Sequence, residues 1–240
     1  MPIQTGSPAA DFISSEGAGL RVAVVDDDTV IRSALPVLLP AVRFSGLYRD
    51  CAELLADHPR VDVVVVDLNF NGRNGSQGIQ ALSTLVSAGY DVCFHTNERR
   101  PPALVCALAV GVRAIVHKDG PLSALADAAS RTARGEIVLT QALVALAEFA
   151  QGRDAMPSLT DPERRVLSAR ARGESWHSMG NRMSISTAAA EEHWAIVAAT
   201  FAGFLRLHSA AELEPMLGLV PGDLLNWIPP DAHPARRVPR

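Results

Sequence analysis

Five side chains that could act together on a phosphoryl group stand at the ends of predicted strands. Asp26 and Asp27 follow the first predicted strand, Asp67 the third, Thr96 the fourth and Lys118 the fifth. In an open parallel α/β sheet, ligands bind beyond the carboxyl ends of the strands, so we expect one shared crevice. Carboxylate oxygens bind Mg²⁺, and the cation, an ammonium and a hydroxyl would stabilise a phosphoryl group held on a carboxylate. The pattern therefore predicts phosphoryl chemistry at this edge.

Lys118 is also unusual in the composition. Of the 22 basic residues, 21 are arginine and Lys118 is the single lysine. A compact ammonium on a flexible stem is required where a planar guanidinium does not fit. The composition thus favours a specific role for Lys118, with chance survival of one lysine as the alternative.

The elements that must position this crevice alternate short apolar runs with amphipathic stretches. One run has almost no polar interruption, which is typical of a strand buried on both faces. Five β–α repeats in residues 20–135 predict an α/β fold with a doubly wound, five-stranded parallel sheet. The expected strands are Val22–Val25, Phe44–Tyr48, Val61–Asp67, Asp91–Thr96 and Ala114–His117, and the expected helices are Thr29–Leu39, Cys51–His58, Ile79–Ala88, Pro102–Val110 and Leu122–Arg134.

Strand patterns end after Gly135, and a small all-α module follows. A capping box with proline in the first turn, Thr160 to Glu163, opens its first helix. Further helices are expected from Ser175 to about Met183, from Ser186 past Phe201, and around Ala210–Leu217. The expected divisions are a tail over 1–19, an α/β domain over 20–135, a connector helix (Gln141–Ala150) and linker within 136–156, a helical domain over 157–220 and a Pro-rich tail over 221–240.

Composition excludes several classes of protein. The net charge is −4 and 48% of residues are hydrophobic, which is enough for a packed core. No apolar run approaches the roughly 18–20 residues of a membrane span, and the first residues lack a secretory pattern, so we expect a cytoplasmic protein without membrane contact. The three cysteines have no metal-ligand spacing and are expected to be buried and reduced: Cys51, Cys93 and Cys106.

The first domain resembles a known family. The segments VAVVDDD at 22–28 and VVVVDLNFNG at 63–72, with Thr96 and Lys118, are similar to the receiver domain of two-component response regulators, over about residues 20–135. The resemblance implies a flavodoxin-like fold and a phosphoacceptor, Asp67, that takes its phosphoryl group from a sensor histidine kinase. It implies Thr96 and Lys118 as phosphoryl-stabilising residues and Asp26, Asp27, Asp67 and the backbone carbonyl of Asn69 as the Mg²⁺ site.

Several positions depart from that family's pattern. Asn71 stands where proline is usual, and Asn97 where a small residue is usual. Ile115 stands where the family usually has an aromatic switch residue, and the segment Arg73–Gly78 is about two residues longer than usual. The phosphorylation residues are therefore present, whereas the usual relay from threonine to an aromatic ring cannot operate.

The second module resembles the LuxR-type helix-turn-helix of NarL/FixJ-class regulators, over about residues 157–217. The similarity is carried by LTDPERRVLSARARGESWHSMGNRMSISTAAAEEHW at 159–194. It implies a third helix that enters the major groove of DNA, control of transcription, and a homodimer when activated. Candidate DNA contacts are Arg164, Arg165, Arg182, Thr187, Glu191 and Glu192, with Arg236, Arg237 and Arg240 of the tail as further sources of positive charge.

The charges of this module oppose that role. Glu191 stands where the family typically has lysine, and Glu192 adds a second carboxylate where DNA phosphates would repel both. Residues 157–217 carry six arginines (164, 165, 170, 172, 182, 206) and seven acids (161, 163, 174, 191, 192, 212, 214), which gives 6 − 7 = −1. The alternative is a degenerate helix-turn-helix that acts by protein–protein interaction.

Helical spacing divides the third helix into two faces. The core face is expected to hold Ala190, His193, Val197 and Phe201, with Trp194 and Phe201 near a face that could join another helix. The opposite face is expected to hold Thr187, Ala188, Glu191, Glu192, Ala195, Ala198 and Ala199.

An enzymatic alternative is a haloacid-type phosphatase with Asp67 as the nucleophile. Such an enzyme would need a second acid at the position of Asn69. We therefore expect a regulator and not an enzyme.

Overall fold

The computed structural model describes residues 19–68 and 75–224. Five parallel strands form one sheet in the order β2-β1-β3-β4-β5. The strands are β1 (Arg21–Val25), β2 (Arg43–Tyr48), β3 (Val63–Val66), β4 (Val92–Thr96) and β5 (Ala114–His117). The predicted doubly wound parallel sheet is confirmed.

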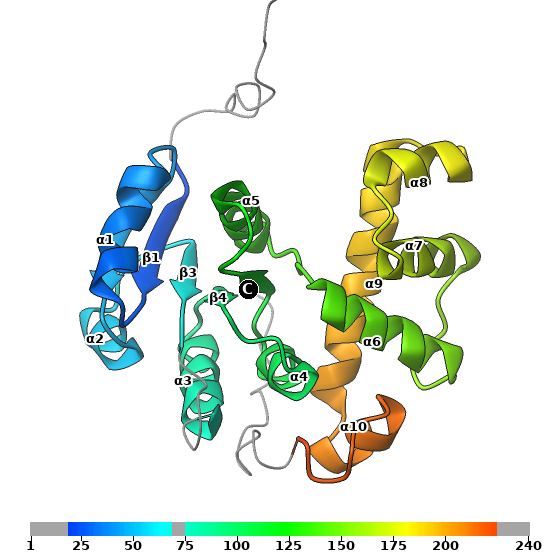
Figure 1. Cartoon of the computed structure of the whole chain (residues 1–240). Coiled ribbons are helices and arrows are strands. Elements are labelled where there is room, and N and C mark those ends of the chain that lie inside the picture. Colours follow the sequence, from blue (N-terminus) through cyan, green and yellow to red (C-terminus); the bar gives the residue numbers. More distant parts are fainter. Residues whose placement is uncertain (1–18, 69–74, 225–240) are drawn as a thin grey trace, which may run out of the picture.

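Helices cover both faces of the sheet (Figure 1). One apolar cluster joins one face to α1 (Thr29–Leu38) and α5 (Leu122–Ala133), and a second joins the other face to α2 (Cys51–Asp57), α3 (Gly75–Ser87) and α4 (Pro101–Ala109). Most ends lie within two residues of the sequence prediction. The largest difference is α3, which begins four residues before the expected Ile79.

The helical module follows as α6 (Gln141–Gly152), α7 (Asp161–Ala171), α8 (Trp176–Met183), α9 (Thr187–Leu207) and α10 (Ala210–Met216). Its caps agree with the sequence: Thr160 and Glu163 form the predicted capping box, and Ser175 and Ser186 cap α8 and α9. The connector helix α6 runs two residues into the predicted linker.

The two faces predicted for α9 are partly wrong. Ala198 is fully buried although it was expected outside, and His193 is only half-buried although it was expected in the core. Trp194 and Phe201 lie in the protein's own core and are not available to another helix. The reason is that α9 packs on α7 and α8 along one part of its length and on α4 along another, which widens its buried face.

The two modules share one core. Helix α4 is buried on all sides, with every residue from Ala103 to Leu108 at 0% exposure. It lies between the sheet and the module that contains α6 and α9 (Figure 1). None of the helices that the structure describes is long and apolar enough to cross a membrane.

A close approach at Gly180 fixes the turn between α8 and α9. A Cβ added there would lie 2.9 Å from the backbone oxygen of Ile185. Glycine-to-alanine changes inside helices normally stabilise by about 1 kcal/mol, but this contact with backbone reverses the sign. We expect Gly180→Ala to lower the free energy of unfolding by about 1–3 kcal/mol and the Tm by several degrees.

Gly203 in α9 provides the matched control. A Cβ at this position meets nothing within 4 Å, so Gly203→Ala should leave stability unchanged or slightly raised. Thermal unfolding of the two variants would decide the point. A Gly180→Ala variant as stable as Gly203→Ala would contradict the close approach.

Candidate functional site

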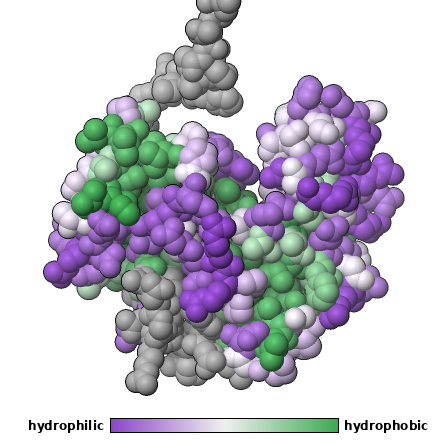
Figure 2. All heavy atoms as spheres, in the orientation of Figure 1, coloured by the Kyte–Doolittle hydropathy of each residue, from purple (hydrophilic) through white to green (hydrophobic). Residues whose placement is uncertain are grey.

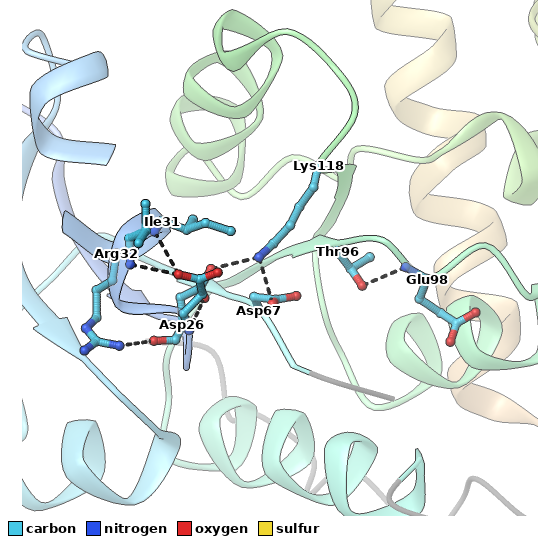
Figure 3. Close-up of polar contacts among 9 residues, drawn as sticks. Asp26, Ile31, Arg32, Asp67, Thr96, Glu98 and Lys118 are labelled. Carbon is cyan, nitrogen blue, oxygen red and sulfur yellow. Dashed lines mark hydrogen bonds and ion pairs between the residues drawn. The ribbon is translucent and has the colours of Figure 1, made fainter. Parts of the chain in front are cut away.

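Lys118 lies between two carboxylates at the carboxyl edge of the sheet. Its Nζ is 2.9 Å from Asp26 Oδ2 and 2.8 Å from Asp67 Oδ2. Asp26 follows β1, Asp67 follows β3 and Lys118 follows β5, so three strands of the sheet deliver the three groups (Figure 3). The Lys118 and Asp26 side chains are 10% and 2% exposed, which makes this a largely buried ion pair.

Three carboxylates gather around this ammonium. Asp26, Asp27 and Asp67 each place an oxygen within 4.8 Å of the others, with Asp26 buried, Asp67 half-buried and Asp27 exposed. When all are ionised, three carboxylates and one ammonium leave a local charge of −3 + 1 = −2. The carboxylate of neighbouring Asp28 caps α1 instead, and the N–H of Asp28 donates to Asp26 Oδ1.

Burial and charge shift the titration of the central pair. Burial raises the pKa of Asp67 and outweighs the lowering effect of Lys118, and Asp26 and Asp27 add to the rise. Burial by itself would lower the pKa of Lys118, but its hydrogen bonds with Asp67 and Asp26 outweigh that effect and raise the pKa overall. Lys118 is therefore a permanent cation at neutral pH, facing an excess of negative charge.

Thr96 lies at the same edge, but its hydroxyl is engaged elsewhere. The side chain is 1% exposed, and Thr96 Oγ1 accepts the N–H of Glu98 at 3.0 Å. Figure 3 shows Thr96 between Asp67 and Glu98, joined to the latter. All the predicted pocket residues within the described chain thus reach one edge, while Asn69 lies outside the described residues.

Two of the positions that depart from the family pattern, Asn97 and Ile115, lie among the described residues. Asn97 is exposed in the loop after β4, and Ile115 is 3% exposed in the core of β5. Asn71 and Arg73 lie outside the described residues.

Two neighbours of the pocket were missed by sequence reasoning. Arg32 of α1 donates to the backbone oxygen of Asp26, and His95 in β4 lies near enough to Lys118 and Asp26 to feel both charges. Neither residue was assigned a role from the sequence, although one could have been given to His95. Its position in an otherwise apolar strand, one residue before Thr96, was a usable signal.

His95 should make the fold sensitive to acid. Burial lowers its pKa to about 4, and the charge of Lys118 contributes to that lowering. Since the unfolded pKa is about 6.5, the unfolded chain binds more protons below that pH, and stability falls as pH decreases toward 4. Between about pH 8 and pH 5 this single group should cost about 2 kcal/mol of unfolding free energy.

The measurement is denaturant unfolding across this pH range for the wild type and His95→Leu. The variant should have a flatter profile by about 2 kcal/mol at pH 5. His177→Gln, which changes an exposed histidine on α8, should leave the profile unchanged. Equal slopes for wild type and His95→Leu would exclude His95 as the sensitive group.

The predicted DNA-contacting arginines are mostly held by the protein itself. Arg164 bonds the Leu159 carbonyl oxygen and pairs with Asp161, while Arg182 pairs with Glu174 at 3.0 Å. Arg165 is exposed. The tail arginines 236, 237 and 240 lie outside the described residues.

The outer surface of α9 near its start is acidic and uncovered. Thr187, Glu191 and Glu192 are all exposed. Among the residues that the structure describes, neither glutamate forms an ion pair. This surface therefore presents two uncompensated carboxylates to any ligand that approaches α9.

Comparison with known proteins finds similarity only among solved structures. Neither a protein-family model nor a curated protein sequence matches the chain. A structure of two RcsB dimers bound to two parallel DNAs is 18% identical, covers 85% of this chain and 100% of that one, and has a TM-score of 0.48. The response regulator ChrA of a haem-sensing two-component system is 23% identical over 87% and 96% of the chains, with a TM-score of 0.43.

A third similar structure covers the first domain only. It is the isolated REC domain of RcsB from Salmonella enterica serovar Typhimurium in the presence of the phosphomimetic BeF3⁻, 20% identical over 52% of this chain and 96% of that one, with a TM-score of 0.45. These similar structures are response regulators, the class that the sequence resembles. Because their identities lie below 25%, the similarity concerns the fold alone.

Proposed function

We propose that the chain is a two-component response regulator whose Asp67 accepts a phosphoryl group from the phosphohistidine of a partner kinase. The observation that carries this proposal is Lys118, the single lysine, held 2.8 Å from Asp67 and 2.9 Å from Asp26 at the edge where ligands bind such sheets. Asp67, the proposed nucleophile, thus lies beside the Lys118 ammonium, and the carboxylate of Asp26 holds that ammonium in position.

The transfer itself exchanges one bond to phosphorus for another. An oxygen of Asp67 attacks the phosphorus, an O–P bond forms, and the N–P bond breaks with its electron pair returning to the histidine nitrogen, which then takes a proton. Lys118 pairs with the phosphoryl oxygens as their charge develops, and the Thr96 hydroxyl can donate to one of them.

The donor set fits Mg²⁺. Three carboxylates within 4.8 Å of one another, one of them exposed, with a local charge of −2, suit a hard divalent cation that keeps several waters. Asp26, Asp27 and Asp67 would hold it, together with the predicted carbonyl of Asn69. The cation would supply charge neutralisation for the transferred group.

The exposed apolar residues of α1 suit docking of the kinase. Val30, Val37 and Leu38 on α1 are exposed by 75%, 78% and 56%, and α1 begins at the cap residue Asp28, next to Asp27. Figure 2 shows the resulting apolar patch over α1. Val30 lies in the first turn of α1, at the pocket end, whereas Val37 and Leu38 lie at the other end of the helix. Exposed apolar residues along α1 favour a protein as the donor.

The direct test is phosphorylation of the purified chain with acetyl phosphate, followed by intact mass spectrometry. We expect Mg²⁺-dependent addition of one phosphoryl group, which peptide mapping assigns to Asp67. Absence of incorporation with Mg²⁺ present, from protein shown to be folded, would overturn the proposal.

For the output we propose control of transcription through the helix-turn-helix formed by α8 and α9, with a homodimer as the expected active form. Exposed Glu191 and Glu192 favour a second candidate, in which this module binds a protein instead of DNA. The two candidates differ in whether the outer surface of α9 faces phosphates.

A charge reversal on α9 should separate them. If α9 faces DNA, Glu191→Lys replaces a repelled carboxylate by a phosphate contact, and affinity for genomic DNA fragments should rise about tenfold or more at low salt. The slope of log K against log salt should steepen by about 1. Binding would be measured on beryllofluoride-treated protein over a salt series.

Glu148→Lys on α6 is the matched control, because it makes the same change in net charge away from α9. An equal effect of the two substitutions would mean that α9 does not face DNA and would favour the protein-binding output.

A further inference from the structure

Helix α9 leaves one face open along most of its length. It spans the helical module from α8 at one end to α10 at the other (Figure 1). The buried residues Val197, Phe201 and Leu205 lie on one side of this helix. On the opposite side, residues three or four apart form a line of exposed or half-buried positions, the outer seam of α9: Ala188, Glu192, Ile196, Ala199, Gly203 and Leu207.

The outer seam is apolar although it faces solvent. Ile196 is 45% exposed and Leu207 is 82% exposed, the highest value among the large apolar side chains that the structure describes. Ala199 and Gly203 lie between them, and Glu192 is the one charged residue of the seam. Exposed apolar residues that repeat with helical spacing are typical of a face that another helix covers.

Gly203 marks the place where a second helix can approach closely. Its φ is not positive, and a Cβ built there meets nothing within 4 Å. Glycine is less stable than alanine inside a helix, and no atom that the structure describes stands close enough to require glycine here. The space beside Gly203 is suited to a large side chain from another helix.

The charges along the seam favour a second copy of α9 as that helix. Glu192 lies seven residues before Ala199, and half-buried Arg206 lies seven residues after it. Two copies that run in opposite directions and cross at Ala199 therefore bring Glu192 of each copy opposite Arg206 of the other. Ile196 of each copy then meets the space beside Gly203 of the other. A two-fold interface requires such self-complementarity, in which residue i contacts j and j contacts i.

We propose that the outer seam of α9 binds the outer seam of a second copy of this chain, as an antiparallel two-fold helix pair centred on Ala199. The proposal rests on the homodimer proposed above, for which it names an interface, but it does not require phosphorylation of Asp67. One helix pair is a small interface, so the association is weak and depends on concentration. Because Glu192 belongs to the seam, a paired α9 cannot face DNA phosphates at the same time.

Analytical ultracentrifugation of the full, unphosphorylated chain over a concentration series tests the association. We expect a monomer–dimer equilibrium in the wild type and a dissociation constant at least tenfold higher in Ala199→Arg, because two guanidinium groups would meet at the two-fold axis. Ala145→Arg is the matched control, since Ala145 is an exposed alanine of α6, and it should dimerise like the wild type. Equal dissociation constants for Ala199→Arg and the wild type, or a wild type that stays monomeric at its highest soluble concentration, would overturn the proposal.

Cross-linking with a short bismaleimide tests the direction of the pair. All three native cysteines are buried, so the wild type provides the background. Ala199→Cys, at the axis, should cross-link to itself. Leu207→Cys should not, because eight residues from the axis on each side place the two thiols roughly 24 Å apart along the helices. A mixture of Leu207→Cys and Glu192→Cys should cross-link, whereas a self-cross-link of Leu207→Cys would overturn the antiparallel arrangement.

These measurements separate the α9 pair from the homodimer on which it rests. A dimer of beryllofluoride-treated protein that Ala199→Arg does not weaken would leave the homodimer standing and place its interface elsewhere. Absence of any dimer, with or without beryllofluoride, would overturn both. Protection of Ala199→Cys from maleimide by genomic DNA fragments, in protein that remains monomeric, would mean that the seam faces DNA and would overturn the pair alone.

Discussion

Phosphoryl incorporation from acetyl phosphate should fall below detection in Asp67→Asn. The amide keeps the size of the side chain but lacks the anionic oxygen that attacks phosphorus, so no acyl phosphate can form at this position. The other carboxylates offer no replacement, because Asp26 is buried and bonded to Lys118 and because, among the described residues, Lys118 pairs with Asp26 and Asp67 but not with Asp27. Intact mass spectrometry after incubation with Mg²⁺ and acetyl phosphate provides the measurement.

Asp62→Asn is the control for this loss. Asp62 precedes β3 at the opposite edge of the sheet, where it pairs with Arg21 at 2.6 Å. Its substitution removes a carboxylate from the same segment and should leave labelling at the wild-type rate. Incorporation by Asp67→Asn at more than a few per cent of that rate would place the phosphoacceptor elsewhere.

The sequence could predict that the pocket side chains lie close together, because this prediction needs only the direction of the strands. Once β1, β3, β4 and β5 are parallel, their carboxyl ends share an edge, and Asp26, Asp67, Thr96 and Lys118 follow those ends. No side-chain packing enters that inference. Caps such as Thr160 and Ser186 were predictable for a similar reason, since they are local in the chain.

Contacts between distant segments could not be predicted in the same way. Periodicity gave α9 a single buried face, but the burial of Trp194 and Ala198 depends on which helices lie beside each part of α9. The complete burial of α4 could not be predicted either, because this helix has no polar face to compare with an apolar one. Its residues are apolar on every side, which fits a helix covered by the sheet alone as well as one enclosed by a second module.

The contacts of Glu98 could not be predicted from the sequence, because its N–H and its carboxylate point in different directions. The sequence places Glu98 two residues after Thr96, which is compatible with many loop conformations. Only the loop as folded directs the N–H to Thr96 and the carboxylate to the start of α4. The sequence predicts the groups gathered at the edge of the sheet, but not the contacts that tie the loop after β4 to the start of α4.

Lys118→Arg should slow labelling by acetyl phosphate at least tenfold although the charge is unchanged. The ammonium contacts carboxylates from two strands at 2.8 and 2.9 Å in a space where its side chain is 10% exposed. A guanidinium is wider and planar, and it bonds one carboxylate best through two parallel N–H groups. It would therefore bind Asp26 or Asp67 alone or displace one of them from the cluster.

Two further substitutions define what the lysine contributes. Lys118→Gln removes the charge and leaves Asp26, 1% exposed, without its cationic partner; we expect the unfolding free energy to fall by roughly 3–5 kcal/mol in Mg²⁺-free buffer and to recover in part with Mg²⁺. Arg99→Lys, in an exposed pair with Asp119, makes the reverse exchange outside the pocket and should label normally. Wild-type labelling by Lys118→Arg would show that any cation suffices, and the single lysine would then reflect chance survival.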